Sequence, residues 1–514
     1  MKKKLPIGIS TFKDIRGENY IYIDKTKEAL SLIENGKYYF LSRPRRFGKS
    51  LFLDTLKEIF KGNKKLFEGL YIYDKYDWSQ KFPVIKISMG GSRSKEDLIN
   101  NLLDNLKVAQ EELQIECEEK KDYAICFKEL IRNAHKKYNQ KVVVLIDEYD
   151  KPILDNIDQV EVAKENREIL KRFYTVIKDS DEFIKFAFLT GVSKFSKVSI
   201  FSGLNNLEDI SLDRRYATIC GYTQNDIESS FAPLLKGVDL EKLKEWYNGY
   251  NFLGESVYNP FDILLFISKG FLFRNYWFST GTPTFLIKML SKKPYNIAEL
   301  ENLVANETLI NSFDIENLKV EPLLFQSGYL TIDRVEVTEF EELMFYLRVP
   351  NKEVQISFNS LLIQYFTDDD SYFLKRQKLY RALDKIDIDE FKEVLISIYA
   401  SIPYNSYSNT PLANYEGYYS NIFYVYIASL GLKIVAEDVT NIGRIDFTLF
   451  IKDKIYIFEF KVGDKALNQI KQRKYYEKYL NQNKDIILVG INFDKEQKNI
   501  KSVEWDHILN SSPK

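Results

Sequence analysis

Two groups of polar residues, far apart in the chain, have the types and spacing that phosphate chemistry requires. The first ends the stretch SRPRRFGKS, where Gly48, Lys49 and Ser50 match the last part of a phosphate-binding loop. In such a loop the backbone N–H groups face the phosphates, the lysine meets the β- and γ-phosphates, and the serine hydroxyl binds Mg²⁺. Arg43 stands where the general pattern has glycine. The alternative is therefore a chance match, with Lys49 in solvent at a helix N-terminus.

A second signal for a nucleotide site follows the apolar run Val142–Ile146, which leads directly into Asp147 and Glu148. Two adjacent carboxylates beside a buried strand are costly unless a cation or hydrogen-bond donors meet them. In P-loop ATPases the first such acid, here Asp147, holds the Mg²⁺ shell, and the second, here Glu148, polarises the attacking water. At the next strand end, FAFLTGVS, Thr190 or Ser193 stands where a polar side chain senses the γ-phosphate. For both strand ends the alternative is a strand that simply emerges into solvent.

The second group of polar residues lies near the C-terminus, in the segments GRIDF and FEFKV. Residues two apart in a strand project from the same face, so Glu459 and Lys461 point together, and a turn at 452–454 can bring Asp446 beside them. Asp446 and Glu459 offer hard oxygen ligands for Mg²⁺. Lys461 is placed to orient or deprotonate a water and to offset charge on a phosphate. The chemistry indicated is phosphodiester hydrolysis, and the alternative is a charge pair on a half-exposed strand.

Alternating strands and helices are predicted to position the first group. Strands are expected at 37–42, 82–88, 142–146 and 184–189, and helices at 51–60, 95–113, 123–138 and 161–179. Continuous apolar strands of this kind indicate a parallel sheet buried on both faces, as in a doubly wound α/β domain. A separate α/β unit is expected around the second group, with helices at 418–430 and 466–480 and strands at 432–438, 445–451, 454–462 and 485–491.

The predicted fold class is therefore α/β, in four parts. A P-loop ATPase domain with a doubly wound parallel sheet is expected over residues 1–220, followed by a mainly helical lid region over 221–295. Residues 296–400 mix short strands and helices, and a winged-helix-like connector is one interpretation of them. A restriction-endonuclease-like α/β domain is expected over 401–514, after a turn-rich linker at 402–417.

Composition excludes several classes of site. The formal net charge is -1, from 73 basic and 74 acidic residues, so no global basic field attracts nucleic acid. Cys117, Cys126 and Cys220 are expected to be separate thiols without a disulfide framework, and with only His135 and His507 a Cys/His zinc site is excluded. The N-terminus has no apolar core of a secretion signal, and no uncharged apolar run approaches about 18 residues. A cytoplasmic protein without a membrane partner is expected.

The stretches SRPRRFGKS, LIDEYDKP, FLTGVSKF and WYNGYNF…VYNPFDIL resemble the bacterial AAA-ATPase-like family, which is similar to the AAA+ and STAND-type P-loop ATPases. The resemblance covers about residues 4–280 and includes the Arg-rich form of the loop. It implies ATP and Mg²⁺ as cofactors, with Glu148 as a catalytic residue. The residues expected to bind the nucleotide and its metal are Arg45, Arg46, Phe47, Gly48, Lys49, Ser50, Asp147 and Thr190.

The arginines of this region have two interpretations each. Arg43, Arg45 and Arg46 can contact phosphate or anchor the loop to its neighbours, and anchoring is favoured for at least one of them. Arg214 or Arg215 is a candidate arginine finger, with plain surface charge as the alternative.

The C-terminal layout resembles the PD-(D/E)XK nuclease superfamily over about residues 410–495, in the form often fused behind such an ATPase. By that resemblance Asp446 and Glu459 bind the metal, and Glu459 and Lys461 form the E-x-K pair. Glu416 is the acidic residue of the first helix. Gln469, with Lys474 and Tyr475, belongs to the helix that supports the site or touches substrate.

The leading interpretation is an ATPase that regulates a Mg²⁺-dependent nuclease acting on nucleic acid, with DNA as the expected partner, in DNA processing or defence. A second interpretation is a STAND-type nucleotide-switched protein whose C-terminal domain binds without cutting. A third is a nucleic-acid-binding protein with a winged helix at 300–400. The sequence leaves the oligomeric state open. AAA+ kinship suggests homo-oligomeric rings, and STAND kinship suggests monomers that assemble.

Overall fold

The computed structural model describes residues 3–194, 204, 206–278, 297–300, 303–310, 315–316, 319–367, 371–402, 416–463, 465–494 and 496–508. The chain divides into two compact units. The first comprises residues 1–286 and 303–351, and the second comprises residues 287–302 and 352–514. The break at residue 351 lies inside the predicted connector at 296–400, and the predicted four-part division stays a prediction. Most of the predicted linker at 402–417 lies outside the described residues.

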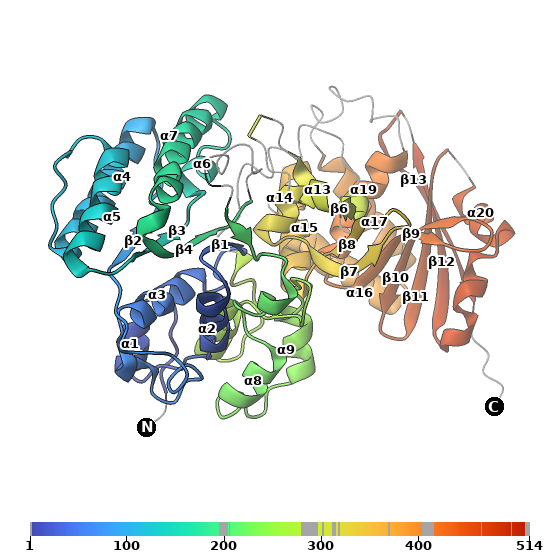
Figure 1. Ribbon diagram of the computed structural model, residues 1–514. Coiled ribbons are helices and arrows are strands. Elements are labelled where there is room, and N and C mark those ends of the chain that lie inside the picture. Colours follow the sequence, from blue (N-terminus) through green and yellow to red (C-terminus); the bar gives the residue numbers. More distant parts are fainter. Residues whose placement is uncertain are drawn as a thin grey trace. The chain divides into compact units, whose positions relative to one another are not determined.

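The first unit is built on a five-stranded sheet with the order β2-β3-β4-β1-β5 (Figure 1). All four of its strand pairs are parallel. The strands are β1 (Tyr38–Ser42), β2 (Val84–Ser88), β3 (Val142–Asp147), β4 (Ile184–Gly191) and β5 (Glu208–Asp209). Every residue of β1 and β3 is buried, as the continuous apolar runs predicted. The central strand β4 lies between β1 and β3. Because the three strands are parallel, their carboxyl ends are neighbours at the same edge of the sheet.

Helices cover both faces of this sheet (Figure 1). One layer consists of α4 (Lys95–Leu113), α5 (Tyr123–Tyr138) and α7 (Val160–Asp179), which pack on one another. The other face carries α3 (Lys49–Phe60), with α1 (Phe12–Gly17) against it and α2 (Thr26–Asn35) nearby in Figure 1. Short helices α6 (Lys151–Leu154) and η4 (Arg214–Tyr216) follow β3 and β5. The doubly wound α/β fold class is confirmed.

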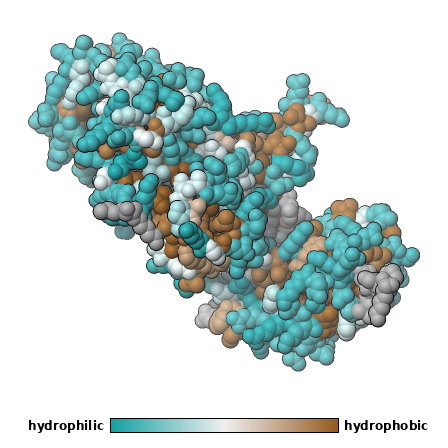
Figure 2. Space-filling view, turned by 90° about the horizontal axis from the view of Figure 1, so that it is seen from below, coloured by the Kyte–Doolittle hydropathy of each residue, from teal (hydrophilic) through white to brown (hydrophobic). Residues whose placement is uncertain are grey.

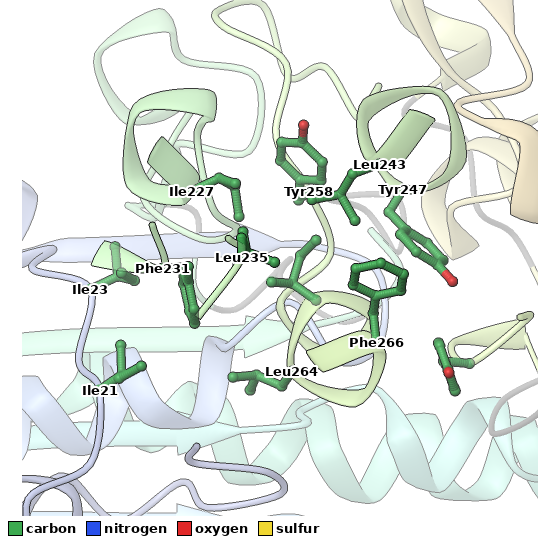
Figure 3. Packing of buried hydrophobic residues seen from close by; sticks show 12 residues of the cluster. Ile21, Ile23, Ile227, Phe231, Leu235, Leu243, Tyr247, Tyr258, Leu264 and Phe266 are labelled. Carbon is green, nitrogen blue, oxygen red and sulfur yellow. The ribbon is translucent and has the colours of Figure 1, made fainter. Parts of the chain in front are cut away.

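A helical region follows, formed by α8 (Gln224–Ser230), α9 (Leu240–Tyr247) and α10 (Pro260–Ser268). Its apolar side chains gather in one cluster with Ile21 and Ile23, which precede α2 (Figure 3). In Figure 3, Leu243, Tyr247 and Phe266 point toward one another from the facing helices α9 and α10. Asn259 caps α10 by accepting the N–H of Phe261, with Pro260 at the first helical position.

The first unit also contains a three-stranded antiparallel sheet with the order β6-β8-β7. Its strands are β6 (Val304–Asn306), β7 (Thr331–Val337) and β8 (Leu343–Arg348), and helices α13 (Glu307–Ile310) and α14 (Val320–Ser327) lie between β6 and β7.

The second unit has a five-stranded sheet with the order β13-β12-β11-β10-β9, in which only the β11–β12 pair is parallel. The strands are β9 (Lys433–Val439), β10 (Arg444–Ile451), β11 (Lys454–Val462), β12 (Asp485–Asp494) and β13 (Asn499–Ile508). Helices precede and flank it: α12 (Ile297–Leu300), α15 (Lys352–Phe366), α16 (Tyr372–Lys385), α17 (Ile388–Ala400), α19 (Glu416–Ala428), α20 (Ala466–Gln472) and the 3₁₀ helix η7 (Tyr475–Gln482).

The two faces of this sheet have different covers. On one face Phe391 of α17 and Phe423 of α19 contact the ring of Phe458 on β11. On the other face, Ile470 of α20 packs in a buried cluster with Ile457 and other residues of the sheet. The alternation of side chains along β11 therefore assigns Glu459 and Lys461 to the face beneath α20.

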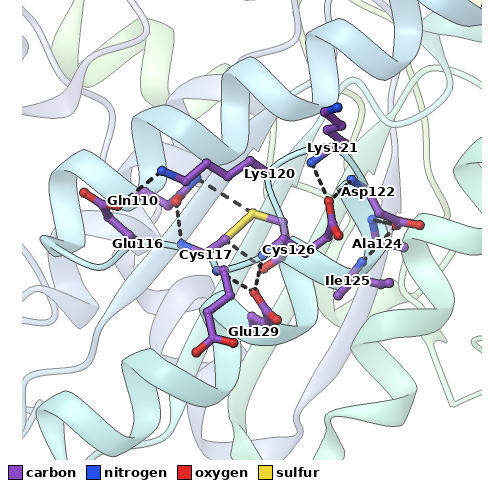
Figure 4. Close-up of a disulfide and its surroundings, with 12 residues drawn as sticks. Gln110, Glu116, Cys117, Lys120, Lys121, Asp122, Ala124, Ile125, Cys126 and Glu129 are labelled. Atoms are coloured by element: carbon purple, nitrogen blue, oxygen red, sulfur yellow. Dashed lines mark hydrogen bonds and ion pairs between the residues drawn. A yellow bond between two sulfur atoms is a disulfide. The ribbon is translucent and has the colours of Figure 1, made fainter.

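One expectation about cysteine was wrong. Cys117 and Cys126, predicted to be separate thiols, form a disulfide with a Cα–Cα distance of 5.3 Å, and Cys220 is a buried free thiol (Figure 4). The loop after α4 folds back so that Cys117 meets the first turn of α5, and Gln110 accepts the Cys117 N–H at 2.7 Å. Spacing in sequence does not reveal such a return of the chain, because it depends on how α4 and α5 pack.

Within the described ranges, the helices are all too short or too polar to cross a bilayer. Figure 2 shows one face of the molecule, on which hydrophilic residues predominate and hydrophobic residues lie in separate patches between them.

Candidate nucleotide and metal sites

The loop between β1 and α3 has the backbone of a phosphate-binding turn. Gly48 has a left-handed φ of 95° and directly precedes Lys49, the first residue of α3. A Cβ at Gly48 would meet no atom within 4 Å, so this backbone faces open space. Arg46 also has a positive φ, at 67°. The N–H groups that begin α3 are therefore available to an anion, as they are at other helix N-termini.

Arg43, the departure from the general loop pattern, anchors the start of the loop. Its side chain is 1% exposed, and its guanidinium donates to the carbonyls of Ser42 (2.9 Å), Ser211 (2.7 Å) and Tyr216 (3.2 Å). The guanidinium also lies 3.9 Å from the ring centre of Phe252. Burial lowers the pKa of Arg43 to about 10, which still leaves it charged at neutral pH. The anchoring interpretation holds for Arg43.

Lys49 points back along the loop. Its ammonium group donates to the carbonyl oxygens of Arg43 at 2.8 Å and Pro44 at 2.9 Å, and the residue is 7% exposed. Burial lowers the pKa of Lys49, and the charges of nearby acids, Asp147 foremost, oppose that fall. A buried ammonium held by two neutral carbonyls is suited to exchanging them for anionic phosphate oxygens.

The carboxyl ends of β3 and β4 bring the predicted acid and sensor together. Ile146 pairs with Leu189, and directly beyond them Thr190 donates its hydroxyl to the Asp147 carboxylate at 2.6 Å. Asp147 is 4% exposed, and Thr190 is fully buried. Glu148 has a positive φ of 53° and forms an ion pair with Lys151 at 2.9 Å. Asp147 and Glu148 are therefore adjacent in sequence but have different partners, Thr190 and Lys151.

Asp150 is a functional candidate that sequence reasoning missed. It is 1% exposed, and its carboxylate accepts the N–H groups of Val192 (3.0 Å) and Ser193 (2.6 Å) and the Ser193 hydroxyl (2.6 Å). Burial raises the pKa of Asp150, and these donors oppose that rise. The bonds hold the chain after β4 against the chain after β3. The sequence did contain a signal for Asp150, because it is the third acid in the stretch LIDEYD.

A cavity of about 520 Å³ opens beside these residues. Its polar wall includes Arg45, Arg46, Gly48, Lys49, Ser50 and Glu148, all of them predicted from the sequence. Its apolar wall includes Pro6, Ile9, Tyr222, Phe261 and Leu264. The guanidinium of Arg46 lies 5.0 Å from the Phe261 ring centre.

The remaining predicted residues are placed differently. Phe47 lines the cavity but is 1% exposed, and its ring packs edge-on against Tyr250. Arg214 and Arg215 are not part of the cavity wall, and Arg215 forms ion pairs with Asp213 and Glu208. For Arg215, the surface-charge interpretation agrees with this placement.

The residues of the cavity fit a nucleotide with its metal. Gly48 faces open space, and Lys49 is a buried cation. Ser50 lines the cavity, whereas Asp147 and Thr190 are buried behind its wall; Ser50 and Asp147 are oxygen donors of the kind that Mg²⁺ prefers when it is shared with phosphates. A nucleotide would supply the anion that these groups lack, with Lys49 at its phosphates.

In the second unit, Asp446 closes the fork between β10 and β11. Phe447 and Phe458 form the last registered pair at this end of the hairpin. Beyond that pair, the Asp446 carboxylate accepts the N–H of Phe460 at 2.7 Å. The Asp446 side chain thus takes the place of a backbone acceptor. The residue that it binds, Phe460, directly follows Glu459.

Glu459 is the buried centre of this site. It is 1% exposed; Lys461 lies 3.7 Å from its carboxylate, and the Gln469 amide donates to the same oxygen. Asn492, fully buried on β12, accepts the N–H of Ala466 and so holds the start of the helix that carries Gln469. The structure therefore brings Asp446, Glu459, Lys461 and Gln469 together, as the sequence predicted. Their catalytic roles stay predictions.

The other residues predicted for this site lie around it. Tyr475 is 2% exposed in the cluster beneath α20, so it is a core residue, and Lys474 is exposed and pairs with Glu477. Glu416 is the first residue of α19, but its side chain lies outside the described set.

The two carboxylates, Asp446 and Glu459, suit Mg²⁺ when waters and substrate phosphates supply its other ligands. No cluster of three or more His, Cys, Asp or Glu side chains suitable for a metal occurs among the described residues. Mg²⁺ is usually bound by one or two carboxylates together with waters and substrate phosphates, and Asp446 and Glu459 meet that requirement.

The segment that follows β11, which contains α20 and then the 3₁₀ helix η7, is strongly basic, and we call it the basic helix. Residues 465–484 contain six lysines and arginines and one acidic residue, against a chain that is close to neutral. The overall charge gave no sign of this concentration. In the structure Lys471, Lys474 and Lys478 form ion pairs with Asp506, Glu477 and Asp438, and Lys465 and Arg473 are exposed.

Comparison with known proteins identifies both domains. A family model described as predicted AAA-ATPase matches residues 6–201, and a model of the PD-(D/E)XK nuclease superfamily matches residues 414–503. A protein from Azotobacter chroococcum mcd 1, described as an uncharacterized protein in the vnfD 5′ region, is 47% identical over 508 residues. That similarity covers 97% of this chain and 98% of the relative. The chain therefore belongs to the family of predicted AAA-ATPases that carry a C-terminal domain of the PD-(D/E)XK nuclease superfamily.

Proposed function

We propose that this protein is a Mg²⁺-dependent nuclease, acting on DNA, whose activity is regulated by ATP bound in the first unit. The observation that carries the proposal is the arrangement at the β10–β11 fork. There Glu459 is buried, contacts Gln469 and lies 3.7 Å from Lys461, and Asp446 accepts the N–H of Phe460, the residue after Glu459. A buried carboxylate with a lysine at this distance, beside a basic helix, is suited to phosphodiester hydrolysis.

Each side chain has a separate role in this proposal. Asp446 and Glu459 hold the metal, which supplies Lewis-acid stabilisation of a phosphoryl oxygen when bound. Lys461 orients the attacking water and offsets negative charge that develops on the phosphate. Gln469 fixes the carboxylate of Glu459 by its hydrogen bond, so that the ligand oxygen is held in one orientation.

The nucleotide site supports a regulatory role through contacts inside the first unit. Gln326 of α14 accepts the N–H of Lys194, which follows the γ-phosphate sensor strand, at 2.8 Å. Gly328, directly after α14, packs so closely on Pro44 of the loop that an added Cβ would lie 2.8 Å from the proline ring. Helix α14 and the residue after it thus contact the chain that follows β4 and the loop that follows β1, and the small sheet leads into the second unit after residue 351. We propose that a change of nucleotide acts on the C-terminal part of the chain along this connection.

A second candidate function is a STAND-type switch whose C-terminal unit binds nucleic acid without cutting it. One observation favours it: among the described residues, the carboxylates at the site number only two, and Glu459 is already engaged by Gln469 and Lys461. Slow ATP turnover without cleavage, together with an ATP-bound oligomer trapped by Glu148→Gln, would support this candidate over the first.

The proposal is tested by Mg²⁺-dependent cleavage of DNA and RNA, with and without ATP, by the full chain and by Lys461→Ala. We expect DNA cleavage by the wild type, a change of rate on adding ATP, and a loss of about 10²-fold or more in Lys461→Ala. Lys454→Ala, on the same strand, is the matched control, because its ion pair with Asp453 is remote from Glu459 along β11. Equal cleavage by Lys461→Ala and wild type would remove Lys461 from the mechanism.

A further inference from the structure

The hairpin tip between β9 and β10, residues 439–443, presents two apolar side chains to solvent. Val439 is 67% exposed and Ile442 is 51% exposed. The turn itself is well bonded: the N–H of Thr440 donates to the carbonyl of Gly443 at 2.7 Å. The Thr440 hydroxyl donates to that carbonyl at 2.9 Å and accepts the Gly443 N–H at 3.1 Å. The two apolar side chains therefore stand on a defined turn.

Two cations from the basic helix hold the tip from one side. Lys478 donates to the carbonyl of Val439 at 3.0 Å, and Arg473 donates to the carbonyl of Ile442 at 3.1 Å. Gly443 permits this approach, because a Cβ there would lie 2.7 Å from the Arg473 guanidinium. The tip is thus fastened to the basic helix through its backbone, and its side chains are left to face outward.

The same helix connects the tip to the candidate active site. Gln469 contacts Glu459, and Arg473, four residues later, contacts the tip. The N–H of Arg473 donates to the Gln469 carbonyl at 3.0 Å, so the two residues are one helical turn apart. At 1.5 Å per residue that is about 6 Å, close to two base steps of about 3.4 Å each along a DNA strand. Gly443 is also only three residues before Asp446.

We propose that the hairpin tip is a wedge that enters the minor groove of duplex DNA and inserts Val439 and Ile442 at a base step beside the phosphodiester to be cleaved. This inference rests on the proposed nuclease function. Apolar side chains are inserted in this way by proteins that kink DNA from the minor groove. The exposed Lys465 and Arg473 carry positive charge for the adjoining phosphates, whereas Lys471, Lys474 and Lys478 are paired with acidic residues.

The chemistry of the tip selects DNA over RNA. The minor groove of an RNA helix is shallow and is recognised through contacts to 2′-hydroxyls and phosphates. The tip offers two hydrocarbon side chains instead, and the Thr440 hydroxyl is already engaged within the turn. Insertion is easiest at pyrimidine–purine steps, which unstack readily, and hardest in stiff A-tracts. The wedge therefore predicts a preference for TA or CA/TG steps near the cleaved bond.

The test uses the full chain carrying Lys461→Ala, so that DNA stays intact, and duplexes with 2-aminopurine at a TA step or within an A-tract. Fluorescence anisotropy reports binding, and 2-aminopurine emission reports unstacking. We expect binding to raise the emission at the TA step and to leave the A-tract nearly unchanged. Adding Val439→Ala and Ile442→Ala should abolish the rise while weakening binding by no more than about tenfold, because the phosphate contacts remain. Val439→Thr with Ile442→Thr, which keeps the branching at Cβ but replaces a hydrocarbon group by a hydroxyl, should act in the same way.

Val337→Ala is the matched control, since Val337 is also 67% exposed on a strand but belongs to the first unit. It should leave emission and affinity unchanged. An undiminished emission rise in the Val439/Ile442 variants with binding intact would overturn the wedge and leave the nuclease proposal standing. An equal rise with an RNA duplex would overturn the assignment to DNA. A complete lack of salt-dependent binding to any nucleic acid would overturn this inference together with the proposed function.

Discussion

Replacing Arg43 by glycine restores the general phosphate-loop pattern in the sequence, yet the structure predicts that this change damages the protein. Arg43 is 1% exposed, and its guanidinium bonds to three backbone carbonyls and lies against Phe252. Glycine removes all of these contacts and leaves the carbonyls of Ser211 and Tyr216 without this donor. The start of the loop would lose its connection to the segment that follows β5.

The size of the effect follows from the opposing contributions. A hydrogen bond to a charged group contributes about 1.5–3 kcal/mol, and a desolvated cation–π contact contributes about 2 kcal/mol. Against this, the fall of the Arg43 pKa to about 10 corresponds to roughly 3 kcal/mol of lost solvation of the charged form. Because such contributions are not additive, we expect Arg43→Gly to lower the free energy of unfolding of the first unit by about 3–5 kcal/mol.

The assay is urea unfolding followed by tryptophan fluorescence, because Trp78, Trp246 and Trp277 belong to the first unit and only Trp505 belongs to the second. Binding of a fluorescent ATP analogue is measured in parallel. Arg45→Ala is the matched control, since Arg45 is an exposed arginine of the same loop, and it should change stability by no more than about 0.5 kcal/mol. An Arg43→Gly protein that is as stable as the wild type and binds ATP more tightly would refute the reasoning.

Two further predictions concern the first unit. Lys49→Met should weaken ATP binding by about 10- to 150-fold, which is the equivalent of one charge-assisted contact. The free energy of unfolding should rise or stay level, because a buried charge is removed. Isothermal calorimetry and urea unfolding measure the two effects, and an unchanged ATP affinity would contradict the prediction. Burial acts to raise the pKa of Asp54, but its bond and ion pair with Lys86 outweigh that effect, so the pKa is lowered. The contribution of Asp54 to stability is therefore present above its unfolded pKa of about 3.9 and is lost as pH falls through the lower folded value. Asp54→Asn should be less stable than wild type at pH 7 by about 1–3 kcal/mol, and the difference should shrink below about pH 4. Unfolding midpoints followed by circular dichroism measure it. A difference that does not depend on pH would count against the ion pair.

Much of the fold could be predicted because its signals are local. Continuous apolar runs predicted β1, β3 and β4, and helical spacing predicted α4 and α5 with the bounds that the structure has. Strand β13 was not predicted, because only Ile500 of its ten residues is buried and its sequence has no continuous apolar run. The helix expected over 466–480 is broken into α20 and η7, where Lys474 adopts a left-handed φ of 47°.

The candidate sites divide in the same way. Residues that are neighbours in sequence, such as Lys49 and Ser50 or Glu459 and Lys461, could be assigned from spacing alone, because a strand or a helix start fixes their relative direction. The hydrogen bond of Thr190 to Asp147 required β3 and β4 to be adjacent. The burial of Arg43 depended on a segment about 170 residues away. The cysteine pair and the hairpin tip likewise depended on which segments return to the same place.

The sequence by itself therefore determined the kinds of chemistry that this protein carries: a lysine and serine for phosphate, acids at strand ends for a metal, and an E-x-K pair on one strand face. Only the tertiary structure decided which of these groups are buried, which are anchors and which meet one another. The physical reason is range: periodicity and turn preferences act over a few residues, whereas burial and partner choice are properties of the packed chain.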